Sequence, residues 1–374
     1  MHISKHNYAI ELEKQGNLVY FMNPPNQDKQ VKDYQVNKVD GYDSLFVIDS
    51  YLPNNKLIDY VRLRLKFTQF YDQYLFKLVK RICKKENIQL EQVWSFDPNL
   101  HGFLYKYPAK NKIFFIADAV QNNSQIRAAK NVDLVVSVAE DILEPFRKIN
   151  SQCLLINHGL NREYEKYAVK KLNELRQQGE TAGSKSNAPI NVGYIGNLLI
   201  PFLYEDGLKK VVTENPGINF HFWGAHSSNS NNLLAVYDDK ILNTIDYLKT
   251  NCKNAFFYGV KTSAQIIEDL DKIDLFIYIN SSEKDINGGA NSHKILEYLS
   301  TGKVVVSTWL SFYEEQKLFP MTVRSGEKEF SNLFSKTICQ LSFYNSVEMQ
   351  KKRIEYSLKC TYDKNILKIQ NSLN

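Results

Sequence analysis

The sequence predicts an α/β protein with two parallel, doubly wound sheets, and two observations carry this prediction. Short apolar runs of four or five residues recur along both halves of the chain, and segments of helical length separate them. Strands that alternate with helices pair in parallel, because each crossover helix returns the chain to the end of the sheet from which it came. With 374 residues, 43% of them hydrophobic, the chain is long enough for two domains with separate cores.

Residues 1–161 are expected to form the first domain. A helix over Ser4–Gln15 ends at Gly16, and a turn at Pro24–Pro25 follows the first strand. A long basic helix is expected between the third strand and the fourth. The predicted strands are Leu18–Met22, Tyr34–Val39, Leu45–Ile48, Val93–Phe96, Ile113–Ala117, Leu134–Val138 and Cys153–Ile156.

A connecting segment over residues 162–190 joins this domain to a second one over residues 191–346. The connection begins as a charged helix, Arg162–Gln178, and continues in the small and polar residues Gly179–Asn187, which are typical of a linker. The strands predicted in the second domain are Val192–Ile195, Phe220–Trp223, Ala255–Tyr258, Leu275–Tyr278 and Val304–Val306. A final helical stretch, Val347–Leu373, follows them.

The cysteines and the apolar runs exclude several classes of protein. The five cysteines are scattered, and neither a Cys-x-x-Cys pair nor a Cys/His ligand spacing occurs, so we expect reduced thiols and no structural zinc. Met1 leads directly into a polar segment rather than a signal peptide, and no apolar run reaches membrane-spanning length. These features predict a cytoplasmic protein.

Positive charge is concentrated in the basic segment, residues 55–85. This segment carries nine Lys or Arg and two Asp, a net charge of +7, whereas the whole chain has a net charge of +6. It also contains aromatic residues such as Phe67, Tyr71 and Phe76. We favour a helix whose aromatic side packs into its own domain; the second hypothesis is a helix that lies on an anionic membrane surface, at the inner face of the membrane. Nucleic-acid binding is not expected, because no recognition motif accompanies the charge.

The segment Asn287–Thr308 carries the strongest indication of function. It reads as a glycine-rich turn, a helix with Lys294 and Glu297, a closing Gly302 and a buried strand. Glycines before a helix let a ligand approach the backbone, and the helix N-terminus attracts anions. Lys294 and Glu297 lie three residues apart and so share one helix face, which suits a ligand with phosphates and sugar hydroxyls. The alternative is an ordinary helix with a surface ion pair.

This segment resembles the Asn-x-x-Lys-x-x-Glu-Tyr-x-x-x-Gly-Lys-x-Val-Val-Ser-Thr signature of GT-B glycosyltransferases of the family-4 kind, which transfer sugars from nucleotide diphosphates. Four further segments resemble that family in the expected order, and His158 stands in the second of them where Asn is usual. They are Asp133–Leu143, Leu155–Asn161, Val192–Asn197 and Phe257–Val260. The resemblance covers most of the chain, from about Leu18 onward.

The resemblance implies two Rossmann-like domains that face each other across a cleft, with the last helix crossing back onto the first domain. It implies a donor site for a nucleotide-diphosphate sugar, no cofactor beyond that substrate and no metal. The implied donor-binding residues are Gly196, Asn197, Gly224, Val260, Lys261, Gly288, Gly289, Asn291, Lys294 and Glu297.

Candidate catalytic residues are Lys294, which would stabilise the departing phosphate, and three residues of the first domain. Asp97, His101 and Asp118 follow predicted strands, and ligands bind at the carboxyl ends of strands in open α/β sheets. Helix N-capping is an equally good interpretation of Asp97 and Asp118. Packing or capping is the simpler interpretation of His101.

Three departures from the family pattern stand out. Gly289 occupies the position at which the family has its first glutamate, and the run Leu198–Asp206 lacks the usual phosphate-binding Arg or Lys. Only Met1–Ile3 precede the helix Ser4–Gln15, where the family has a first strand and a glycine-rich loop. Two hypotheses follow: Met1 is an internal methionine of a longer protein, or this branch lost the strand and is weakly active or inactive.

The resemblance therefore implies a retaining, metal-independent hexosyltransferase that acts in polysaccharide biosynthesis. Its acceptor would be a cell-surface glycan or a lipid-linked oligosaccharide, by analogy with the family. Two alternatives remain open: a non-catalytic GT-B subunit, and a nucleotide-sugar epimerase on the same fold.

Overall fold

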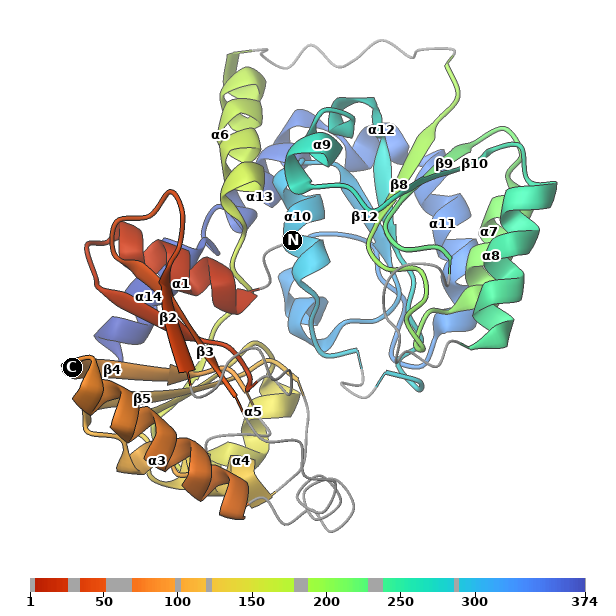
Figure 1. The fold of residues 1–374 in the computed structure, drawn as a ribbon. Helices are drawn as coiled ribbons and strands as arrows, with labels where there is room; N and C mark the ends of the chain where they lie inside the picture. Colours follow the sequence, from red (N-terminus) through yellow and green to blue (C-terminus); the bar gives the residue numbers. More distant parts are fainter. Residues whose placement is uncertain are drawn as a thin grey trace. The chain divides into compact units, whose positions relative to one another are not determined.

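The structure, a computed structural model, describes residues 4–25, 34–51, 69–97, 102–118, 123–177, 188–227, 238–285 and 289–373. The chain divides into two compact units (Figure 1). The first comprises Met1–Asn157 together with Tyr362–Asn374, and the second is the continuous segment His158–Thr361. The predicted linker Gly179–Asn187 lies outside the described residues.

A four-stranded parallel sheet forms the centre of the first unit. Its order is β4 (Leu90–Ser95), β5 (Ala109–Ile116), β6 (Leu134–Ser137) and β7 (Cys153–Leu155). Helices α4 (Asn123–Lys130) and α5 (Glu140–Arg147) provide the crossovers that parallel pairing requires. All four residues of β6 are buried, as expected for a strand covered on both faces. The predicted parallel arrangement of these four strands is confirmed.

The three strands before them form a separate small sheet, which the sequence did not predict. Its order is β1 (Val19–Met22), β3 (Leu45–Ser50) and β2 (Tyr34–Lys38), with β1 parallel and β2 antiparallel to β3. The antiparallel pairing follows from the short connection between β2 and β3, in which the Tyr42 amide donates to the Val39 carbonyl at 3.2 Å. A parallel crossover needs a dozen or more residues, so this turn can only form a hairpin.

Three further helices pack in the first unit: α1 (Ser4–Lys14), α3 (Gln69–Lys85) and α14 (Tyr362–Asn371). On α1, Tyr8 is buried with its ring 5.3 Å from that of Phe115 and 4.9 Å from that of Tyr362. α3 is the described part of the basic segment, since residues 52–68 lie outside the described part of the chain. It buries Leu75 and Ile82 within its own unit.

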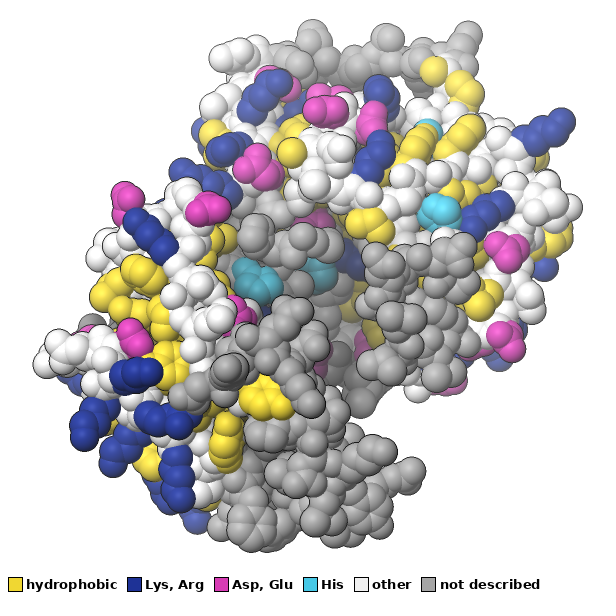
Figure 2. Space-filling model, in the orientation of Figure 1, with side chains coloured by type: hydrophobic (Ala, Val, Ile, Leu, Met, Phe, Trp, Pro, Cys, Tyr) yellow, Lys and Arg dark blue, Asp and Glu magenta, His cyan; other side chains and the backbone are white. Residues whose placement is uncertain are grey.

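Lysines and arginines project from the outer side of α3. Figure 2 shows Lys and Arg side chains gathered at the lower left, where α3 lies in Figure 1. Lys77, Lys80, Lys84 and Lys85 are exposed. Among the described residues, no helix is both long enough and apolar enough to cross a bilayer.

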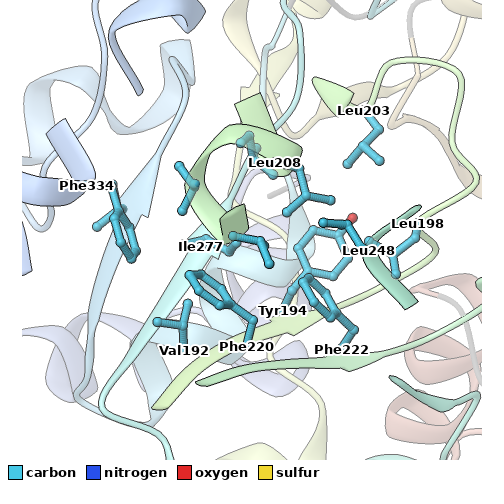
Figure 3. Packing of buried hydrophobic residues seen from close by; sticks show 14 of the residues in the cluster. Val192, Tyr194, Leu198, Leu203, Leu208, Phe220, Phe222, Leu248, Ile277 and Phe334 are labelled. Carbon is cyan, nitrogen blue, oxygen red and sulfur yellow. The ribbon is translucent and has the colours of Figure 1, made fainter. Parts of the chain in front are cut away.

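The second unit is built on a five-stranded, wholly parallel sheet. Its order is β10 (Ala255–Gly259), β9 (Asn219–Trp223), β8 (Asn191–Ile195), β11 (Leu275–Tyr278) and β12 (Val304–Ser307). One core joins the sheet to α7 (Glu205–Glu214), α8 (Asp239–Asn251) and α11 (Phe330–Cys339), and Figure 3 shows Phe220, Ile277 and Leu208 within it. A second core joins the sheet to α6 (Arg162–Gln177), α9 (Ser263–Ile267) and α10 (His293–Ser300). The predicted doubly wound arrangement is therefore confirmed for this unit.

Four 3-10 helices and one short α-helix complete the described structure. They are η1 (Leu104–Lys106), η2 (Leu270–Lys272), η3 (Ser311–Gln316), η4 (Glu327–Glu329) and α12 (Leu341–Tyr344). The final helical stretch is broken into α13 (Val347–Ser357) and α14. At the break, the Leu160 amide donates to the Cys360 carbonyl at 2.7 Å, and α14 then belongs to the first unit.

Arg353 on α13 connects three separate turns of the second unit. Its guanidinium is fully buried and donates to the carbonyls of Gly302 (2.7 Å), Tyr344 (2.6 Å) and Leu318 (3.0 Å). The Gly302 carbonyl lies just beyond the end of α10, so the cation also faces the negative end of that helix. Burial lowers the pKa of Arg353 to about 10, which leaves the group charged at neutral pH.

We expect Arg353→Leu to destabilise the second unit by about 3 kcal/mol, because three buried carbonyls lose their donors. Arg353→Lys should lower the stability by less than Arg353→Leu does, because its single amine can bind some of the three carbonyls but not all of them. Urea unfolding in a Trp94→Phe background, where Trp223 and Trp309 report on the second unit, measures the loss. Arg162→Leu, at an exposed position, is the matched control and should change stability little. Equal stability of Arg353→Leu and the control would contradict this anchoring role.

Candidate functional site

Three glycine turns lie side by side at the carboxyl ends of β8, β9 and β10. The Gly196 amide donates to the Trp223 carbonyl at 2.7 Å, and the Gly224 amide donates to the Gly259 carbonyl at 2.8 Å. Gly196 and Gly224 have φ angles of +147° and +143°, and a Cβ on Gly224 would lie 1.9 Å from the Gly196 carbonyl oxygen. No side chain fits between these turns, so the sheet ends there in bare backbone that a ligand can approach closely.

Lys294, in the first turn of α10, reaches this edge of the sheet. Its Nζ donates to the Tyr194 hydroxyl at 3.3 Å and lies 5.0 Å from the centre of that ring. A Cβ built on Gly196 would lie 2.2 Å from the same Nζ. The amine therefore rests directly on the glycine turn after β8, and any larger residue at position 196 would displace it.

Tyr298 fixes α10 against β8. Its hydroxyl accepts a hydrogen bond from the Ile195 amide at 2.9 Å and donates to the Ile195 carbonyl at 3.2 Å. Its ring stacks on Phe276 at 4.5 Å, and that ring leaves no room for a Cβ at Gly193, which would lie 2.6 Å away. No role for Tyr298 followed from the sequence, although this residue stands in the quoted signature next to Glu297.

Lys294 and Glu297 form a half-buried pair of opposite charges whose pKa values approach each other. Burial lowers the pKa of Lys294 to about 8, and the nearby Glu297 carboxylate opposes that shift. Burial likewise raises the pKa of Glu297 to about 7, against the effect of Lys294. Within the described residues, no hydrogen bond reaches the Glu297 carboxylate. A cation and an uncommitted acceptor thus lie one turn apart on the helix.

Two histidines lie beside this pair. The rings of His158 and His293 meet edge to face with centroids 6.0 Å apart. Burial of the ring and the nearby Lys294 charge lower the pKa of His293 to about 4, although part of its side chain is exposed. Burial and the neighbouring His293 lower the pKa of His158 to about 3. Both histidines are therefore neutral at pH 7. His158 was noted in the sequence only as a departure from the family pattern and was not assigned to the site.

Hydrogen bonds to Ser311 and Asp285 hold the loop before α10 in place. Gly289 accepts a hydrogen bond from the Ser311 amide at 3.0 Å, and its own amide donates to Asp285 Oδ2 at 3.3 Å. The Asn291 side-chain oxygen accepts from the Ser292 amide at 2.7 Å, at the start of the helix. Gly288 lies outside the described residues.

Three other predicted donor residues lie along the same strand ends. The Asn197 side chain accepts from the Leu199 amide at 2.8 Å and so shapes its own turn. Val260 is 68% exposed. The Lys261 amine lies 3.9 Å from Asp269 and 5.1 Å from the centre of the Tyr258 ring. Lys261 thus has a carboxylate partner within the unit.

The start of α7 carries a buried acid in the segment where the family pattern has a phosphate-binding cation. Glu205, which is 1% exposed, accepts from Lys240 at 2.8 Å and from Lys284 at 3.1 Å. This segment therefore holds a buried acid that two lysines neutralise. The composition of the run Leu198–Asp206 did not reveal this arrangement, because both lysines come from distant parts of the chain.

The predicted acceptor-side residues belong to the first unit. Asp97 follows β4 and Asp118 follows β5, which are neighbouring parallel strands. His101 lies outside the described residues. The structure thus brings Asp97 and Asp118 to the same end of one sheet, and neither belongs to the unit that contains Lys294. No group of three or more His, Cys, Asp or Glu within the described ranges is arranged to hold a metal ion.

No protein-family model and no curated protein matches the sequence. Solved structures do match. The apo structure of OtsA has a TM-score of 0.70 at 12% identity, covering 100% of this chain and 96% of that one. A UDP-forming α,α-trehalose-phosphate synthase from Burkholderia xenovorans has a TM-score of 0.67 at 10% identity, with coverages of 98% and 96%. Anabaena Alr3699/HepE in complex with UDP has a TM-score of 0.56 at 14% identity, covering 79% of this chain and 82% of that one. The chain therefore has the GT-B fold, with two Rossmann-like domains.

Proposed function

We propose that the protein is a retaining glycosyltransferase that moves a hexose from a nucleotide-diphosphate donor to a cell-surface glycan or a lipid-linked oligosaccharide. One observation carries the proposal: the Lys294 amine rests on the bare glycine turn after β8, with the half-buried Glu297 one turn further along α10. The likeness to Anabaena HepE, whose structure contains UDP, supports a nucleotide ligand.

The proposed donor lies along the ends of β8, β9 and β10. Its diphosphate contacts Lys294 and the amides at the start of α10, where the helix dipole favours negative charge. Its ribose hydroxyls donate to Glu297, whose carboxylate has no hydrogen-bond partner among the described residues. A ligand without these hydroxyls would leave the carboxylate unpaired in the complex, and such a ligand binds much more weakly.

The proposed reaction needs stabilisation of a departing phosphate more than it needs a general base. When the bond between the sugar and the diphosphate breaks, negative charge develops on the phosphate oxygen that leaves. A cation and fixed amide dipoles beside that oxygen lower the barrier. The leaving phosphate then accepts the proton of the acceptor hydroxyl on the same face of the sugar, so the anomeric configuration is retained.

The exposed cations of α3 support an acceptor held at a membrane surface. Clustered lysines attract anionic lipid headgroups, and a lipid-linked acceptor lies in that surface. This side of the helix is available because its apolar side already packs into the first unit. We propose that the protein works in the cytoplasm at the inner face of the membrane and uses no cofactor other than the donor.

The first prediction from this proposed function is that one of UDP, GDP and ADP stabilises the protein selectively. A ligand that binds only the folded state raises the melting temperature with the logarithm of its concentration. Glu297→Ala should weaken that binding by about 1–3 kcal/mol, because hydrogen bonds to a charged group are lost. Calorimetric titration of the preferred nucleotide measures the change. Glu315→Ala, at an exposed position, is the matched control and should bind as the wild type does.

Failure of every nucleotide to bind a folded sample would overturn the donor site. Nucleotide binding that Glu297→Ala leaves unchanged would overturn the assignment of that residue. Donor binding without hydrolysis or transfer would favour a non-catalytic subunit, and conversion of the sugar in the absence of an acceptor would favour an epimerase.

The second prediction concerns pH. Nucleotide affinity should be highest between about pH 7 and pH 8, because Glu297 is ionised above its pKa of about 7 and Lys294 is protonated below its pKa of about 8. Above pH 8 the affinity should fall as the amine loses its proton, and below pH 7 as the carboxylate gains one. Lys294→Arg should remove the alkaline decline, since a guanidinium stays charged. Titrations of both proteins from pH 6 to about pH 9.5 test this, and parallel alkaline limbs would refute it.

A further inference from the structure

A buried hydroxyl group on α6 has no hydrogen-bond partner within the described parts of the chain. It belongs to Tyr164, whose side chain is 1% exposed. Buried polar groups in folded proteins are nearly always paired, and one that is left unpaired lowers the stability of the fold. An unpaired hydroxyl in the second unit, which also contains Lys294 and Glu297, therefore needs an explanation.

The first turn of α6 holds the Tyr164 ring in a fixed place. The Tyr164 amide donates to Asn161 Oδ1 at 3.1 Å, and Asn161 Nδ2 donates to Ser263 Oγ at 3.1 Å, which joins the start of α6 to the start of α9. The ring itself lies in the core that α6 shares with α9 and α10. Because close packing fixes the ring, a polar group that pairs with its hydroxyl must come to it.

The acceptor that could do so is Glu297, on the neighbouring helix α10. Burial raises the pKa of the Tyr164 hydroxyl, and the Glu297 charge adds to that shift, so the two groups lie within electrostatic reach of each other. Other donors near the carboxylate are already used, since the Lys294 amine and the Tyr298 hydroxyl each donate to another group. Among the described residues, Tyr164 thus has an unused donor beside the unused acceptor of Glu297.

We propose that Tyr164 is a positioning residue for Glu297: in the nucleotide complex its hydroxyl donates to the carboxylate oxygen that the ribose leaves free. This inference rests on the proposed function, in which Glu297 accepts from the ribose. A nucleotide that covers the half-buried carboxylate removes water from it, and a buried carboxylate needs donors on both oxygens. The long Glu297 side chain can turn toward the fixed phenol, since rotamer changes are common when a partner binds. A carboxylate held at one oxygen presents the other to the ribose in a single orientation.

The test is a double-mutant cycle measured by calorimetric titration of the full chain, with whichever of UDP, GDP and ADP binds the wild type. Tyr164→Phe should weaken binding roughly tenfold, because a hydrogen bond to a charged group is lost. In a Glu297→Ala background the same change should alter binding by less than about twofold, because the hydroxyl then has no carboxylate to hold. Tyr167→Phe is the matched control: its hydroxyl lies on the same helix but donates to Asp271 at 2.8 Å, and its loss should leave binding unchanged.

The melting temperature of the unliganded protein separates this role from a structural one. Tyr164→Phe should leave it unchanged or raise it slightly, because the lost hydroxyl is unpaired in the free protein. A lower melting temperature, or equal weakening of nucleotide binding in both backgrounds, would assign the hydroxyl to the fold and overturn the proposal. Binding that depends on Glu297 but not on Tyr164 would overturn this inference alone. Absence of binding by all three nucleotides would overturn the proposed function, and this inference with it.

Discussion

Tyr298 sets the register of α10 against β8, while Ile295, Leu296 and Leu299 bury the apolar face of the helix. Tyr298 uses both its proton and its lone pair on the backbone of Ile195, the last residue of β8, and its ring stacks on Phe276 of the neighbouring strand. Lys294 lies about one turn before Tyr298 and so falls onto Gly196 when Tyr298 is seated. A shift of α10 by one residue would turn its side chains by about 100° and carry the amine off the glycine turn. Gly193, Gly196 and Tyr298 therefore act as one packing unit, although only Gly196 was singled out from the sequence.

Several parts of this arrangement could be predicted from the sequence. The apolar runs located every strand of the second unit to within one residue at either end, because buried parallel strands are continuous apolar segments. The separate small sheet of the first unit could not be predicted in the same way, because the sequence of β1 and β2 predicts strands but not the strands with which they pair. The pairing of β2 depended on the tight turn before Leu45.

The residues of the candidate site also fall into two groups, those that local sequence predicts and those that only long-range contacts define. Lys294 and Glu297 were found because their spacing on a helix is local information. The contacts of Tyr298 with Ile195 and of Glu205 with Lys240 and Lys284 join segments far apart in the chain, and no periodicity reports such contacts.

The division of the chain has a consequence for biosynthesis. The second unit is one continuous segment inserted into the first, and Leu160 and Cys360, near its two ends, are joined by a hydrogen bond. The first unit depends on Tyr362, Ile366 and Ile369 for part of its core. A ribosome makes every residue of the second unit before it makes those of α14, and domains generally fold as units. The first unit therefore cannot complete its core until the whole of the second unit has been synthesised.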